Sequence, residues 1–179
     1  MGQAKNTKAQ LAGFIAKYDV EIADLAETIL AEMRKLYPTA LELVYDNYNA
    51  LAIGFCPTDR TTEAIFSIAL YPRWVSLFFL QARELPDPDK LLRGSGSTAR
   101  HIVLPSPDAL YHPAVRSLMR EAEARAKVPF DPKGERRLII RSISAAQRPR
   151  RPAAKSAPTA SRSGIESKGK RATAGARKS

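Results

Sequence analysis

The chain has 179 residues, a length typical of one ordinary domain with a short appendage. Hydrophobic residues make up 44% of the sequence and charged residues 26%, which excludes a chain that is disordered throughout. The net charge of +11 is unevenly distributed, because residues 147–179 carry ten lysines and arginines and one acid, whereas residues 1–146 are almost neutral. The composition therefore predicts a nearly neutral folded domain followed by a cationic tail.

No stretch approaches the roughly 18 consecutive apolar residues that a membrane-spanning helix needs. The first residues lack the apolar core of a secretory signal peptide. The single cysteine, Cys56, cannot form an internal disulfide or a thiolate metal cage. We therefore expect a cytoplasmic protein that has no membrane partner, no metal site and no cofactor.

Three segments have the apolar spacing of amphipathic helices. Apolar side chains recur at i, i+3, i+4 and i+7 over residues 8–18, and a second helix is predicted over 20–36 behind a potential cap, Asp19. Pro113 suits the first turn of a third helix over residues 113–127. All three helices have one apolar side that can cover a sheet.

Short apolar runs bounded by turn residues predict six strands: Leu41–Tyr45, Leu51–Phe55, Ala64–Leu70, Val75–Leu80, Arg100–Leu104 and Leu138–Ile143. The connections between the first four strands are too short for a parallel crossover, so these strands are predicted to form an antiparallel meander. Helices at both ends of such a sheet predict an α+β domain over residues 8–145, in which N-terminal helices and a C-terminal helix pack on an antiparallel sheet.

Residues 146–179 differ in composition from the rest of the chain. From Gln147 onward there is no aromatic residue and one branched aliphatic residue, Ile165. Such a segment cannot bury enough apolar surface to offset the entropy lost on ordering. We therefore predict a disordered tail rich in Lys, Arg, Ala, Ser and Pro.

Four segments of the predicted domain resemble the YdhG-like family: Leu43–Leu51, Ala64–Trp74, Leu92–Ile102 and Leu138–Ser144. This is a bacterial domain family of unknown function, one member of which has been described as a frataxin-like iron chaperone. The resemblance covers roughly residues 10–145, and its most specific part is the glycine turn followed by Arg100 and His101. It implies an α+β fold with an antiparallel sheet and implies no particular reaction.

The glycine turn is the first candidate site. Backbone N–H groups at Gly94 and Gly96 could bind an anion, with charge supplied by Arg93 and Arg100. The alternative is a structural turn in which glycine supplies a positive φ. His101 could act there as a general base or a proton switch, or could be a half-buried, hydrogen-bonded residue.

A second candidate lies at the predicted hairpin, where Tyr45 and Tyr48 could line a small-molecule pocket together with Trp74 from the next turn. These aromatic side chains could equally pack at the rim of the sheet with their polar tips in water. Clustered acids on the second predicted helix could hold iron weakly, although a solvated helix face carries the same pattern: Glu21, Asp24, Glu27 and Glu32.

The tail provides the third candidate. A flexible cationic segment can follow a phosphate backbone and release counterions, so the tail predicts non-specific affinity for nucleic acid. The alternative is a tail that only increases solubility. The ten cations concerned are Arg148, Arg150, Arg151, Lys155, Arg162, Lys168, Lys170, Arg171, Arg177 and Lys178.

No Ser-His-Asp, Cys-His or paired-carboxylate arrangement can be identified, so we expect a non-catalytic binding or interaction module with a nucleic-acid-binding tail. An alternative is a frataxin-like chaperone that binds iron or a small ligand on its folded domain. An enzyme that works near Arg100 and His101 is a third, less favoured alternative.

Overall fold

The computed structural model describes residues 2–152 of the chain. The helices and strands within this range are α1 (Gly2–Ile15), α2 (Val20–Leu36), β1 (Leu41–Asp46), β2 (Leu51–Cys56), η1 (Thr61–Glu63), β3 (Phe66–Tyr71), β4 (Trp74–Phe79), β5 (Arg100–Leu104), η2 (Pro107–Tyr111), α3 (Pro113–Ala124) and β6 (Leu138–Ile143). The prediction of an α+β domain is confirmed. No helix of the described range is long and apolar enough to cross a membrane.

The predicted second helix is confirmed at both ends, although Asp19 makes no capping hydrogen bond through its side chain. The first helix was predicted over 8–18, but α1 begins earlier, at Gly2, and ends earlier, at Ile15. There the chain tightens into a turn in which the Tyr18 N–H donates to the Ile15 carbonyl over 3.0 Å. This turn places the Tyr18 side chain in the core, where it is 1% exposed. The third helix begins at Pro113 as predicted and ends slightly earlier, at Ala124.

The six strands form one sheet in the order β5-β4-β3-β2-β1-β6. The predicted meander is confirmed, because β1 to β5 pair with their neighbours in antiparallel fashion. The prediction of a wholly antiparallel sheet is wrong, since β6 pairs with β1 in parallel. The long segment that contains α3 carries the chain from the β5 edge back to the β1 edge, and a parallel pair requires such a crossover.

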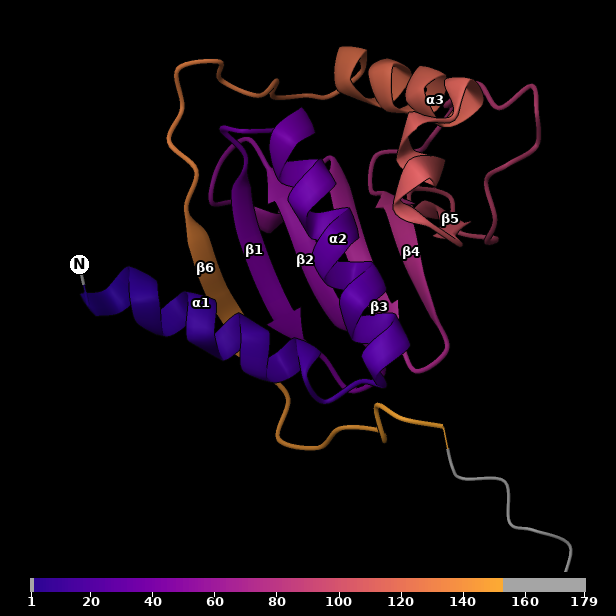
Figure 1. Ribbon diagram of the computed structural model, residues 1–179. Coiled ribbons are helices and arrows are strands. Elements are labelled where there is room, and N and C mark those ends of the chain that lie inside the picture. The colour runs from indigo at the N-terminus through magenta and orange to yellow at the C-terminus, as the bar shows by residue number, and fades with distance from the viewer. Residues whose placement is uncertain (1, 153–179) are drawn as a thin grey trace, which may run out of the picture.

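The main core lies on one face of the sheet, beneath α1 and α2, with α3 beyond the upper ends of the central strands in the view of Figure 1. Alternate residues of the strands point into it, such as Ile53, Ile68 and Leu77, each 0% exposed. The apolar side of α2 packs on them through Ala26, Ile29, Leu30 and Met33. In the described part of the chain, no α-helix covers the opposite face, which we call the open face.

The chain does not leave the domain at residue 145, where the sequence analysis placed its end. Residues 144–152, here called the C-terminal strap, run along the β1–β2 hairpin, where the backbone N–H groups of Ser144 and Arg148 donate to the carbonyls of Asp46 and Tyr48 over 2.9 Å each. The folded part of the chain therefore extends to the end of the described range. The rest of the predicted tail, residues 153–179, lies outside the described residues.

Candidate functional site

The open face consists of two rows of side chains set by the strand register. One row crosses the sheet as Tyr45, Ala52, Ala69, Ser76 and Val103. The neighbouring row is Leu43, Gly54, Ser67, Phe78 and His101. Small residues therefore occupy the middle of both rows and larger side chains occupy the two sides, which leaves a hollow over β2 and β3.

This hollow is a cavity of about 520 Å³ that opens to solvent. Its volume lies within the range of small-molecule sites. None of the side chains that line it carries a charge: they are Tyr45, Asn47, Tyr48, Asn49, Ala50, Ala52, Gly54, Cys56, Thr61, Ala64, Ser67, Ala69, Tyr71, Phe78 and Leu80. A lining without charge is notable in a chain in which 26% of the residues are charged.

A few polar groups interrupt the apolar lining. The hydroxyl groups of Ser67 and Tyr71 have no hydrogen-bond partner among the described residues, and burial raises the pKa of Tyr71 above its usual value. The hydroxyls of Tyr45 and Thr61 hydrogen-bond to each other across the rim. The cavity therefore offers these two free hydroxyl groups, together with the amide side chains of Asn47 and Asn49, on a lining that is otherwise largely apolar.

Two of the three predicted pocket aromatics, Tyr45 and Tyr48, line this cavity. Trp74 is 41% exposed and touches the cavity wall only indirectly, through its ring stacked on Tyr71 at 5.1 Å. The sequence analysis missed the floor of the cavity, Ala52, Gly54, Ser67 and Ala69. A usable signal was the alternation of small residues with large apolar ones along two neighbouring strands.

Cys56 lies at the edge of the same cavity and is fully buried. Burial raises the pKa of its thiol to about 12, so the thiolate is scarce at neutral pH. The side chain therefore contributes apolar surface to the cavity rather than a nucleophile.

Both glycines of the turn, Gly94 and Gly96, have a structural role. Gly94 has a φ of +100°, and a Cβ at Gly96 would lie 2.7 Å from the Ala99 carbonyl oxygen. Arg93 pairs with His101 through backbone hydrogen bonds of 2.7 and 3.0 Å. The Arg100 side chain donates to the Leu92 carbonyl over 3.0 Å, so one of its terminal nitrogens is used within the protein, and anion binding at this turn stays a prediction.

His101 packs with its ring stacked on Phe78, at a centroid separation of 4.9 Å. Burial, together with the positive charges of Arg93 and Arg100, lowers the pKa of its imidazole. The neutral ring therefore dominates at pH 7 and extends the aromatic side of the open face beyond Phe78.

Replacing Gly96 by alanine is expected to destabilise the domain by about 1–3 kcal/mol, the usual cost of an enforced steric clash. The new methyl group would meet backbone rather than a flexible side chain. The matched control is Gly13→Ala in α1, where nothing lies within 4 Å of the added atom. That change should stabilise the helix by about 0.5–1 kcal/mol. Urea unfolding measures both, and equal stability of the two variants would contradict the structural role of Gly96.

The helix acids proposed for iron do not gather into one site. No group of three or more His, Cys, Asp or Glu side chains that could hold a metal ion occurs in residues covered by the structure. Glu32 instead accepts hydrogen bonds from Lys35 and Tyr111, which lower the pKa of its carboxyl group.

The three predicted tail arginines that the structure covers all contact the domain. The Arg150 side chain is 3% exposed and is paired with Asp46 at 2.8 Å, which contradicts its predicted role as a free phosphate contact. Arg148 lies over the Tyr48 ring at 5.8 Å, and Arg151 lies 3.7 Å from Asp19. The other seven tail cations lie outside the described range.

No family model, curated protein or solved structure matches this chain, so its resemblance to the YdhG-like family remains a prediction.

Proposed function

We propose that the protein is a non-catalytic binding module whose open face receives a neutral, flat, largely apolar small molecule. The observation that carries this proposal is the uncharged 520 Å³ cavity with a floor of small residues and aromatic sides. Most small-molecule sites share this character, being apolar with a few polar groups that orient the ligand.

The lining argues for a neutral ligand. A charged group placed in the cavity would lose part of its hydration and find no opposite charge on the lining side chains. The free hydroxyl groups of Ser67 and Tyr71 can instead hydrogen-bond to a carbonyl, hydroxyl or ring nitrogen of a neutral ligand.

The arrangement of the side chains argues for a flat ligand. Ala52, Gly54 and Ala69 project little from the sheet, so a planar molecule can lie directly on the strands. Tyr45 flanks this floor on one side and Phe78 on the other. Contacts between aromatic rings add about 0.5–1.5 kcal/mol per pair beyond the area that they bury.

The test uses the neutral fluorophore N-phenyl-1-naphthylamine as a probe of the cavity. Ala52→Phe would place a ring on the floor and is expected to weaken probe binding at least about tenfold, or about 1.4 kcal/mol. Ala124→Phe, at the exposed end of α3, is the matched control and should bind like the native chain.

Fluorescence titration of the full chain measures the affinity, and circular dichroism checks that each variant is folded. If a folded Ala52→Phe variant binds the probe as tightly as the native chain, the open face is not the site. Ala52→Leu serves as a smaller obstruction if the phenylalanine variant does not fold.

The nucleic-acid affinity of the basic tail remains a second part of the proposal. It rests on seven cations after residue 152, because the three described arginines of the tail already contact the domain. Iron binding, suggested by the resemblance to the YdhG-like family and by the acids of α2, stays a prediction.

A further inference from the structure

A second, larger hollow lies on the helix side of the molecule, between α1, α2 and the β6 edge of the sheet. This cleft has a volume of about 980 Å³. In contrast to the open face, charged side chains line it: Lys8, Glu27, Arg34, Glu42, Glu135, Arg136 and Arg137. The two hollows are therefore suited to ligands of different charge.

Glu42 lies at the floor of the cleft and is 2% exposed. Arg34 from α2 holds it through two hydrogen bonds, in which Nε and one terminal nitrogen donate over 2.8 and 2.6 Å. A buried carboxylate needs such a partner, since its isolated charge would be costly in the interior. The pair thereby fixes the Arg34 guanidinium in the floor of the cleft.

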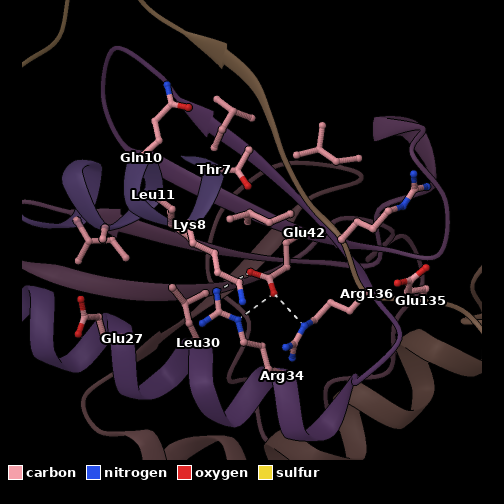
Figure 2. Close-up of a pocket in the computed structure, with 16 residues that line it drawn as sticks. Thr7, Lys8, Gln10, Leu11, Glu27, Leu30, Arg34, Glu42, Glu135 and Arg136 are labelled. Atoms are coloured by element: carbon pink, nitrogen blue, oxygen red, sulfur yellow. Dashed lines mark hydrogen bonds and ion pairs between the residues drawn. The ribbon is translucent and has the colours of Figure 1, made fainter. Parts of the chain in front are cut away.

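More positive charge surrounds this carboxylate than it can neutralise. Figure 2 shows Lys8, Arg34 and Arg136 pointing toward Glu42 from three different elements of the chain. Arg136 is the outer partner, 3.9 Å from Glu42 and 42% exposed. In the same view Glu27 and Glu135 lie apart from this cluster, one on either side.

The donors of this cluster are not all used within the protein. The second terminal nitrogen of Arg34 and the ammonium group of Lys8 have no hydrogen-bond partner among residues 6–152, whose side chains the structure describes. The charged lining as a whole has four cations and three acids, so the cleft keeps an excess of one positive charge, and the cations nearest to Glu42 outnumber it. Guanidinium and ammonium groups in this arrangement match the oxygens of a carboxylate, phosphate or sulfonate.

The remaining wall of the cleft is apolar and is formed by side chains of both helices and of β6: Leu11, Ala12, Ile15, Leu30, Leu138 and Ile140. An inorganic ion would leave this surface in contact with water. An anionic head group attached to an apolar body would cover it and gain from its burial.

We propose that this cleft is a binding site for an organic anion, with the head group held by Lys8, Arg34 and Arg136 and the apolar body lying between α1 and β6. This site is separate from the cavity on the open face, and the proposal does not depend on the function assigned to that cavity.

The experiment compares two probes that share one ring system. The probe 8-anilinonaphthalene-1-sulfonate carries an anionic sulfonate, whereas N-phenyl-1-naphthylamine is neutral. Both are titrated into the native chain and into a variant with Lys8→Gln and Arg136→Gln. These two side chains are exposed and their loss should leave the fold intact, whereas Arg34 and Glu42 support each other in the floor.

The double variant is expected to bind the sulfonate probe about tenfold more weakly, because it loses two charged contacts to the head group. Its affinity for the neutral probe should not change. Arg83→Gln, an exposed cation in the loop after β4, is the matched control and should bind both probes like the native chain. In the native chain decanoate should displace the sulfonate probe, and decanol at equal concentration should not.

Native affinity of the double variant for the sulfonate probe would overturn the proposal. The proposal would also be overturned if Ala52→Phe alone abolished binding of the sulfonate probe, because the anion would then bind on the open face. A different result is that Ala52→Phe leaves the affinity for the neutral probe unchanged while the double variant loses affinity for the sulfonate probe. In that case only the function proposed for the open face is wrong.

Discussion

Replacing Arg150 by alanine is expected to lower the free energy of unfolding by about 2–3 kcal/mol, somewhat less than the usual cost of removing one partner of a buried ion pair, because a second cation stays beside the carboxylate. The side chains of Arg150 and Asp46 are 3% and 1% exposed, and the guanidinium also donates to the Asn47 carbonyl. The variant would leave Asp46 buried with Lys17 as its remaining cation, at 2.7 Å. Urea unfolding of the full chain measures the difference.

Arg151→Ala is the matched control, since this neighbouring arginine is 61% exposed and reaches Asp19 only at 3.7 Å. Its loss should cost about 0.5 kcal/mol or less.

The same reasoning applies to truncation: a chain that ends after residue 146 loses Arg150 and should be destabilised, whereas one that ends after residue 152 should not. Equal stability of the two truncated chains would contradict a structural role for the C-terminal strap.

The pH dependence provides a second readout of the same ion pair. Burial alone would raise the pKa of the Asp46 carboxyl group, but hydrogen bonds from Lys17, Gln147 and Arg150 outweigh it and hold the pKa below its usual value. The ionised carboxylate therefore stabilises the native chain at neutral pH, and this contribution is lost as the pH falls below about 4 and through the lowered pKa. The stability difference between the native chain and Arg150→Ala should accordingly narrow in acid.

The local elements of this fold can be predicted from the sequence because each has its own pattern. The apolar periodicity of residues 20–36 and the short apolar runs between turn residues identify α2 and the strands of the meander. The residues of β6 were also predicted correctly, but its place in the sheet, beside β1, has no local signal in the sequence. Its exposed second half contributes no alternation, and its pairing with β1 depends on the path of the chain after α3.

The C-terminal strap shows why composition misjudged the end of the domain. Residues 147–152 contain only Gln, Arg and Pro, and such a segment is typical of a solvated tail. Arg150 is nevertheless buried, because Asp46 lies at the end of β1 on the helix side of the sheet and needs a partner. A single acid near the end of an apolar strand is the only trace of this pairing in the sequence.

The candidate sites were predictable to different degrees. Aromatic side chains at the hairpin pointed to the open-face cavity, because Tyr45 and Tyr48 are close in sequence. The cationic cleft depends on Lys8, Arg34 and Arg136, which are distant in the chain and come together only through packing of both helices on the β6 edge. Glu42, inside an apolar strand, was the one residue that could have signalled a buried charge there.

Tyr18→Phe is expected to destabilise the domain by about 2–3 kcal/mol, because removal of one hydroxyl group leaves two buried backbone groups without their partner. The Tyr18 hydroxyl donates to the Leu70 carbonyl over 2.9 Å and accepts from the Leu51 N–H over 3.0 Å. It thereby links the turn after α1 to the ends of β2 and β3. Burial raises the pKa of this phenol to about 12, so it remains a donor at any pH at which the domain is studied.

The control for this variant is Tyr111→Phe, which removes a hydroxyl group from a side chain that is 47% exposed and bonded to Glu32 at the surface. Water can replace that bond, so the stability should change by about 0.5 kcal/mol or less. Because the ring itself is unchanged in both variants, the measured differences report only the contributions of the two hydroxyl groups to stability. Equal urea midpoints for the two variants would show that the Tyr18 hydroxyl does not hold β2 and β3 to the turn after α1, and that packing of its ring alone fixes this corner.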